Sequence, residues 1–307
     1  MGYLVKGNMT SNIKAEGAPL ERSAFRFFKI TSVLPALPFL LIFGFFFIYP
    51  ITKLIYVSFM SNENTFTFGN FQTAFTQPYS TGFVNSIKIA FLSALIAAFP
   101  GAIAAYFIET RGPSKLKRSL AMMNGVLANT GGVPLAFMFM AAIGMQGTLT
   151  KVLKYFGIDI YAGTFSLGTF TGILLVYLYF QLPLMVIVFS PAIMSLRREW
   201  VEAAKNLGAS QINYWFRVGF PLLFPSFIAS FLLLFASGFS AYATANALTV
   251  GNLPLTPLQI GGLLDGNVSA SQLNLGKALS VVMILISAVA VIPYLIIQRK
   301  AARWQRR

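Results

Sequence analysis

The chain has 307 residues, of which 56% are hydrophobic and only 10% are charged. A soluble domain has about 25% charged residues, so most of this chain does not face water. The formal net charge of +15 lies in short segments between apolar runs, without the continuous basic face that a nucleic-acid partner needs. The sequence contains no cysteine and no histidine, which excludes disulfides and thiolate metal sites and removes the commonest general base. We therefore expect no catalytic residues, no metal site and no nucleic-acid partner.

A polar tail covers residues 1–32. It lacks the short apolar core and the small-residue cleavage site of a secretory signal, and is therefore predicted to be a cytoplasmic extension. Its basic residues are Lys6, Lys14, Arg22, Arg26 and Lys29.

Six apolar stretches follow the tail, and each is long enough to cross a bilayer, which takes about 20 helical residues. They are apolar all round rather than striped, which argues against soluble amphipathic helices. The sequence thus predicts an all-α integral membrane protein with six transmembrane helices. The stretches cover residues 33–59, 84–108, 120–145, 167–190, 221–250 and 278–297.

The direction of the six spans follows from the basic residues. Eighteen of the 23 Lys and Arg residues lie in the tail, in the loop after the second span, in the insert after the fourth span, or at the end of the chain. With six spans, these segments all lie on one side. Because basic loops stay in the cytoplasm, both termini and the insert are predicted to be cytoplasmic.

None of the eight acidic residues lies in the middle of a predicted span. A charge at the bilayer centre costs at least ~2.5–3.5 kcal/mol, and one that persists there usually marks an ion path. Without a carboxylate inside a span, the usual carrier of proton-coupled transport is missing. An intramembrane aspartyl protease, which needs paired aspartates within spans, is excluded. The sequence also has no GxxxxGK[ST] loop, so if ATP drives this protein, another subunit must bind it.

The polar insert at 195–220 is predicted to form a helix–turn–helix between the fourth and fifth spans. Gly208 suits the left-handed position after a helix, Ser210 can cap a second short helix, and Pro221 suits the first turn of the next span. The Glu-Ala-Ala sequence at 202–204 offers one charge and two small side chains, which would let another protein approach closely. A solvated linker whose alanines merely favour helix explains the same residues, and both interpretations stay open.

Several uncharged polar residues lie within the predicted spans. They could line a translocation path that opens to water on alternate sides. They could equally serve packing, because small residues four apart let helices approach and hydroxyls bond between helices. The amides are more costly than the hydroxyls to leave unpaired in lipid. The candidates for the substrate pathway are Asn129, Gln181, Ser237, Ser240, Thr244 and Asn246.

The insert resembles the EAA loop of type I ABC importer permeases. The matching residues are Glu202, Ala203, Ala204, Gly208, Val218, Phe220 and Pro221, at the family's spacing; Val218 and Phe220 stand where Ile and Leu are commoner. The resemblance extends to "LPALPFLLIFGFFFIYPITKLIYVSF", "VPLAFMFMAAIGMQGTLTKVLKYFGI" and "YFQLPLMVIVFSPAIMSLRREWVEAAKNLGAS", and so covers most of the chain. The nearest branch serves polyamines, phosphonates, thiamine or ferric iron.

The resemblance implies a multi-pass permease subunit of the bacterial inner membrane, without enzymatic activity. Two ABC ATPase subunits would carry ATP and Mg, an extracytoplasmic binding protein would deliver a small solute such as a polyamine or phosphonate, and a second permease, a different chain, would complete the path. By the same resemblance, the ATPase-coupling residues are Glu202, Ala203, Ala204, Gly208, Ala209 and Phe216, with Ala209 and Phe216 supporting the loop by packing.

The predicted organisation has four segments. They are the cytoplasmic tail (1–32), the first transmembrane helix with its outer loop (33–82), the permease core of five helices with the coupling loop (83–298), and a basic cytoplasmic tail (299–307). Two rival functions remain at this point. A stand-alone secondary carrier or channel would make the Glu-Ala-Ala spacing a coincidence, and a membrane-embedded enzyme is disfavoured by the missing histidine and cysteine.

Overall fold

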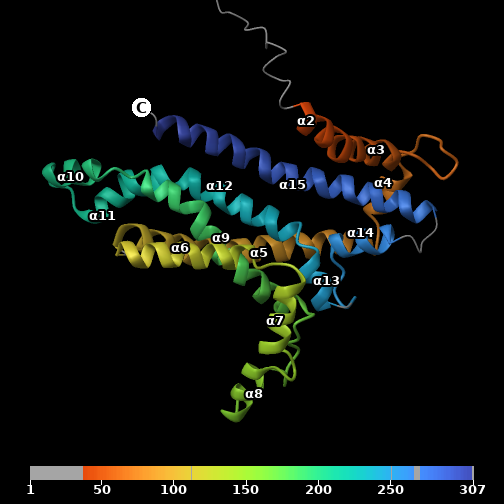
Figure 1. Cartoon of the computed structure of the whole chain (residues 1–307), viewed down its shortest axis with the longest axis horizontal. Coiled ribbons are helices and arrows are strands. Elements are labelled where there is room, and N and C mark those ends of the chain that lie inside the picture. The colour runs from red at the N-terminus through yellow and green to blue at the C-terminus, as the bar shows by residue number, and fades with distance from the viewer. Residues whose placement is uncertain (1–36, 112, 250, 266–269, 306–307) are drawn as a thin grey trace, which may run out of the picture. The chain divides into compact units, whose positions relative to one another are not determined.

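A computed structural model of the chain describes residues 37–111, 113–249, 251–265 and 270–305. The described residues form helices, with one isolated β-bridge between Met60 and Phe66 and no strand. The predicted cytoplasmic tail at 1–32 and the last two residues lie outside the described residues. The prediction of an all-α chain is confirmed for the part that the structure describes (Figure 1).

The chain divides into two compact units, residues 1–51 and 52–307. The described part of the first unit contains α2 (Leu37–Phe43), the π-helical turn η2 (Gly44–Ile48) and the start of α3 (Tyr49–Ser58). No described residue of α2 or η2 is buried. The rings of Phe39, Phe43 and Phe47 stack at four-residue spacing, with centroids 6.1 and 5.3 Å apart. Such an apolar helix suits a lipid environment.

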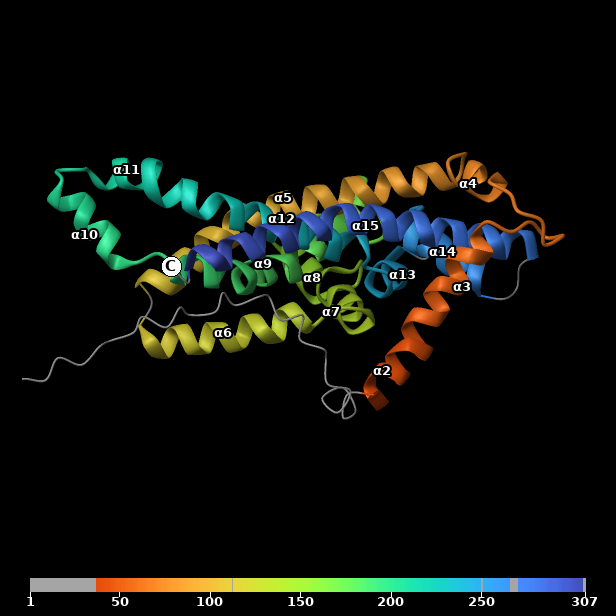
Figure 2. The same ribbon diagram turned by 90° about the horizontal axis from the view of Figure 1, so that it is seen from above.

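The second unit is built around long helices that run side by side (Figures 1 and 2). Helix α5 packs against α9 and α12, α12 also packs against α15, and α6 packs against α9. Their bounds are α5 Tyr79–Arg111, α6 Ser114–Asn129, α9 Phe170–Met194, α12 Phe220–Phe239 and α15 Ala270–Gln305. Small residues allow this close packing: Ala97 and Ala98 of α5 are fully buried, and Gly101 lies against Met185 of α9.

Six helical segments among the described residues are long and apolar enough to cross a membrane, as predicted from the sequence. Their bounds are Leu37–Ser58, Tyr79–Arg111, Val133–Tyr155, Phe170–Met194, Gln211–Phe239 and Gln272–Arg299.

Two of the six predicted spans were wrong in detail, because each is interrupted. The third, predicted at 120–145, is split into α6 and α7 (Val133–Ile143), and Gly132 between them has φ +75°. Helix α7 then leaves the bundle at a steep angle (Figure 1). The fifth, predicted at 221–250, is split into α12 and α13 (Ala243–Thr249). Apolar composition shows that a stretch can enter a membrane but not that its helix is continuous.

Shorter helices complete the second unit. They are α4 (Gly69–Ala74), α8 (Thr148–Tyr155), α10 (Arg198–Asn206), α11 (Gln211–Tyr214), the π-helical turn η3 (Trp215–Gly219) and α14 (Thr256–Leu264).

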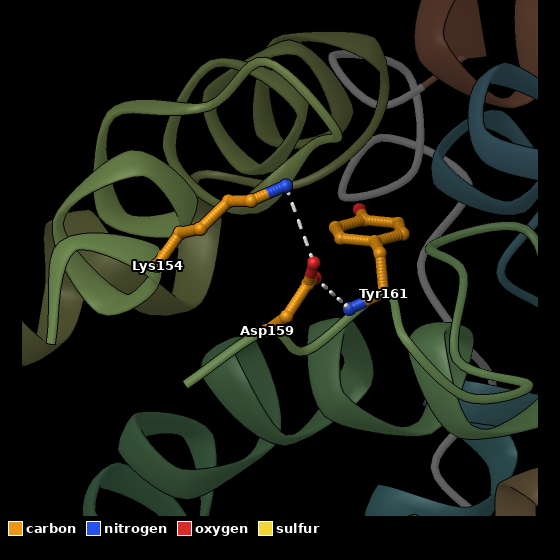
Figure 3. Close-up of polar contacts among 3 residues, drawn as sticks. All are labelled: Lys154, Asp159 and Tyr161. Atoms are coloured by element: carbon orange, nitrogen blue, oxygen red, sulfur yellow. Dashed lines mark hydrogen bonds and ion pairs between the residues drawn. The ribbon is translucent and has the colours of Figure 1, made fainter. Parts of the chain in front are cut away.

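Polar contacts hold the loop after α8, and Figure 3 shows those of Asp159 with Lys154 and Tyr161. The carboxylate of Asp159 accepts a hydrogen bond from the Tyr161 N–H at 3.0 Å and pairs with the Lys154 ammonium at 3.3 Å. The Tyr161 N–H, and then Lys154, hold the pKa of Asp159 below its usual value. The Tyr161 hydroxyl donates to the carbonyl of Ile143 at 2.7 Å, at the end of α7. These contacts give a chain segment outside the bundle a fixed local structure.

Candidate functional site

The insert forms the predicted helix–turn–helix, made of α10 and α11. Gly208 has φ +75°, and its N–H donates to the carbonyl of Lys205 at 2.9 Å, as expected after a helix. The hydroxyl of Ser210 accepts the N–H of Asn213 at 3.3 Å and so caps α11. The hairpin lies at the end of the bundle where α5 and α9 end and where α6 and α12 begin (Figure 1).

The second helix of the hairpin differs from the prediction because it continues into the fifth span without a break. Helix α11 passes through η3 directly into α12. The N–H of Phe220 bonds to the carbonyl of Trp215, five residues back. Pro221 has no N–H to give to the carbonyl of Arg217, so a regular α-helical turn is interrupted at this point, and the wider π turn lies directly before it.

The predicted coupling residues lie together on this hairpin. Glu202, Ala203 and Gly208 are exposed, whereas Ala204 and Ala209 are half-buried. Phe216 differs from the prediction that it supports the loop by packing: its side chain is 75% exposed. The adjacent Trp215 packs against the bundle instead, because neighbouring positions of a helix point in different directions.

Large apolar side chains are exposed beside the predicted coupling residues. Leu207 is 87% exposed and Ile212 is 68% exposed, and with Phe216 they are the most exposed large apolar side chains between residues 198 and 219. Exposed apolar surface with a polar rim is typical of a protein interaction site. The sequence reasoning missed Leu207 and Ile212, although bulky apolar residues inside a charged insert were the signal that could have identified them.

The structure places Gln181, a candidate for the substrate pathway, inside the bundle. Its side chain is fully buried on α9, and its Nε2 donates to the hydroxyl of Ser93 on α5 at 3.0 Å. Its Oε1 has no hydrogen-bond partner among the described residues. In this structure Gln181 therefore links α9 to α5.

The other candidates separate into three environments. Ser237 and Thr244 line a cavity of about 280 Å³ where the two interrupted spans meet, together with Gly131 and Gly132. Ser240 lines a second, more apolar cavity of about 510 Å³ against α14 and α15. Asn129 and Asn246 are exposed, and the amide of Asn129 donates to the carbonyl of Gly125 within α6.

The two interrupted spans are joined by one hydroxyl group. Thr244 on α13 accepts the N–H of Gly132 at 2.9 Å and donates to the carbonyl of the same residue at 3.1 Å. The hydroxyl of Tyr177 on α9 donates to the carbonyl of Ala241 at 3.0 Å, in the second break. Backbone groups at membrane depth must be satisfied within the protein, and these side chains replace helical partners lost at each break.

Replacing Thr244 by valine is expected to lower the melting temperature of the permease in detergent, because both bonds to Gly132 are lost. The cost is about 0.5–1.5 kcal/mol for each hydrogen bond, because Gly132 is half-buried and its carbonyl still accepts the N–H of Ala136 at 3.3 Å. Thr244→Ser keeps the hydroxyl and should stay close to wild type, as should the exposed control Thr164→Val. Equal destabilisation by Thr244→Ser and Thr244→Val would contradict a role of the hydroxyl.

A family model described as "Binding-protein-dependent transport system inner membrane component" matches residues 113–307. The chain belongs to this family. It is therefore the permease component of an ABC importer, a multi-pass inner-membrane protein and not an enzyme. Among the residues that the structure describes, no group of three His, Cys, Asp or Glu side chains could hold a metal ion.

Curated relatives of this permease transport different solutes. It is 24% identical over 262 residues to the spermidine/putrescine transport system permease protein PotB of Haemophilus influenzae, covering 81% of this chain and 88% of PotB. It is 26% identical to PotC of the same organism, covering 71% of this chain and 76% of PotC. A probable sulfate transport permease, cysT of Helicosporidium sp. subsp. Simulium jonesii, is 27% identical over 56% of this chain and 61% of that relative.

The fold of this permease is similar to that of a chain in a bacterial ABC transporter that imports the acidic polysaccharide alginate. The TM-score is 0.68 at 16% identity, and the match covers 89% of this chain and 95% of that one. A structure of the alginate transporter with an alginate-bound periplasmic protein gives a TM-score of 0.67, also at 16% identity. At this identity the likeness concerns the fold alone.

Proposed function

We propose that this permease forms the translocation path for a small solute delivered by a binding protein, and that the α10–α11 hairpin is the EAA loop that docks on an ABC ATPase. The observation that carries the proposal is the hairpin itself. It projects the Glu202–Ala203–Ala204 sequence and an unpartnered apolar surface (Leu207, Ile212 and Phe216) from one end of the bundle. Small side chains beside a charge let a partner approach closely, and the exposed apolar groups offer area to bury.

The hairpin end of the bundle is the proposed cytoplasmic end. Several helices begin or end at this end of the bundle, and basic residues lie at these helix ends. They are Arg111 at the end of α5, Lys115 at the start of α6, Arg197 before α10 and Arg299 near the end of α15. Positively charged segments are retained in the cytoplasm. The proposal places both termini on the same side.

The proposed assembly contains two permeases, two ATPase subunits that bind ATP and Mg, and an extracytoplasmic solute-binding protein. We propose that the second permease is a different chain, as the resemblance to the polyamine branch implies. Within this chain, residues 83–298 would form the permease core and 299–307 a basic cytoplasmic tail. Membership of the importer family leaves no support for a stand-alone carrier or channel.

A small charged solute of the polyamine or phosphonate type is the proposed cargo. The similarity to PotB, which spans most of both chains, supports the polyamine branch. Ser237 and Thr244 are proposed to line the path at the cavity between the interrupted spans, and Ser240 at the second cavity. Asn129 and Asn246 are exposed and available to it, whereas Gln181 would need a rearrangement of α5 and α9 to reach it.

The docking assignment is tested by Glu202→Lys, measured as the amount of cognate ATPase that co-purifies with the permease from detergent. Reversing this charge on the exposed docking helix is expected to reduce the ATPase recovered at least tenfold, because a lysine would face a surface that accommodates a carboxylate. Asp265→Lys makes the same charge change at an exposed position after α14 and serves as the control. Recovery of the wild-type amount of ATPase with Glu202→Lys would show that α10 is not part of the docking surface.

A further inference from the structure

The hairpin is attached to the rest of the chain at few points. Every residue of α10 whose side chain is described is exposed or half-buried. In α11 and η3, the buried residues are Tyr214 and Gly219. Trp215 between them is half-buried and packs against the bundle. Movement of α10 can therefore reach the bundle through this short segment, in addition to residues 195–197, which join α10 to α9.

Trp215 meets helix α5 through a single ring contact. Its indole lies edge-to-face with the ring of Tyr106, with centroids 5.0 Å apart and planes at 83°. Gly219 leaves room for the indole: a Cβ atom added at Gly219 would lie 2.6 Å from Cε3 of Trp215. Edge-to-face pairs are a preferred aromatic geometry, and the glycine fixes where the indole can lie.

Tyr106 and Trp215 also pack against a buried apolar cluster shared by three long helices. It includes Ala105 of α5, Met185 of α9 and Leu223 of α12. Close-packed interiors transmit displacement because they compress little. A movement of the Trp215 ring is therefore passed to α5, α9 and α12 together.

We propose that Trp215 is the positioning residue that passes movement of the docking hairpin to α5 through Tyr106. The inference rests on the proposed function, in which α10 docks on the ATPase, and adds the point at which docking becomes movement of the bundle. Trp215 lies in the π-helical turn between α11 and α12. Its role differs from that of Phe216, which is exposed to the proposed partner.

The test separates docking from transmission with two measurements on each variant. Co-purification of the cognate ATPase reports docking, and stimulation of ATP hydrolysis by the cognate solute-binding protein in proteoliposomes reports transmission. With Trp215→Ala, the ATPase recovered should stay within twofold of wild type, whereas the stimulation should fall at least tenfold. Trp215→Phe keeps an aromatic edge against Tyr106 and should restore stimulation to within threefold of wild type.

Gly219→Ala provides a second, milder variant. Alanine favours helix more than glycine does, so the helix is retained, but the added methyl must displace the Trp215 ring. Stimulation should fall at least threefold with docking unchanged, and this variant decides the matter if Trp215→Ala does not fold. Wild-type stimulation in either folded variant overturns the inference. Failure of the ATPase to co-purify even with wild type would instead overturn the proposed function.

Discussion

Replacing Gly208 by proline is expected to release the ATPase subunit from the purified permease while leaving the transmembrane bundle folded. Gly208 has φ +75°, whereas proline is restricted to a φ near −65°. Proline would also remove the N–H that donates to the carbonyl of Lys205. The turn between α10 and α11 must then change, and the proposed docking residues on either side of it would no longer share one surface. The ATPase recovered by co-purification should fall at least tenfold.

Gly157 provides a matched control for this substitution. It has φ +81°, and its N–H donates to the carbonyl of Lys154 at 3.0 Å, so it closes α8 in the same way that Gly208 closes α10. Gly157→Pro should impose the same local strain and leave ATPase recovery unchanged. Both variants should keep the melting temperature in detergent within a few degrees of wild type. Equal loss of the ATPase in the two variants would show that general damage, and not the hairpin, is responsible.

Replacing Gly101 by leucine is expected to abolish the folded permease. Helices α5 and α9 approach so closely that a Cβ atom on Gly101 would lie 2.6 Å from Cβ of Met185 and 3.2 Å from the carbonyl oxygen of Leu182. Neither atom belongs to the end of a flexible side chain, so the helices themselves must separate. Overpacking a tight core costs about 1–3 kcal/mol. The atoms that Gly101 meets belong to the start of a side chain and to the backbone of α9, so this site is expected to lie at the upper end of that range or beyond it. Loss of the monodisperse peak in size-exclusion chromatography measures the outcome.

Gly125→Leu is the control for Gly101→Leu. Gly125 lies in α6, and no heavy atom of the described residues comes within 4 Å of a Cβ atom added there, apart from its own helix and chain neighbours. The same four-carbon side chain should therefore be accommodated with a near-normal melting temperature. If Gly101→Leu is recovered as well as Gly125→Leu, the close approach of α5 and α9 does not support the fold.

Local chemistry was sufficient to predict the shape of the α10–α11 hairpin. Gly208 adopts the left-handed conformation and Ser210 caps the following helix, as expected from the residue types. Both features depend on a few neighbouring residues, since a left-handed turn needs a residue without Cβ and a helix start needs a side-chain acceptor. The six apolar segments were predictable for a similar reason, because hydropathy sums over one continuous stretch.

Contacts between residues that are far apart in the sequence could not be predicted from local chemistry. Thr244 bonds to Gly132 across 112 positions, and Gln181 bonds to Ser93 across 88. The residues next to Thr244 and Gln181 in the sequence do not specify which distant residue each will contact. From the sequence alone, each side chain could therefore serve either helix packing or the translocation path. The structure shows that Gln181 connects two helices and that Thr244 satisfies a backbone break beside a cavity.

The sequence by itself determined that this chain enters a membrane six times and carries a polar, helix-forming hairpin before the fifth entry. Only the tertiary structure decided that two of the six segments are broken and that Trp215, not Phe216, meets the bundle. The physical reason is that burial in lipid and turn conformation depend on residues that are adjacent in the chain. Helix continuity and side-chain direction are settled instead by which partners the packed helices bring within hydrogen-bonding or ring-contact distance.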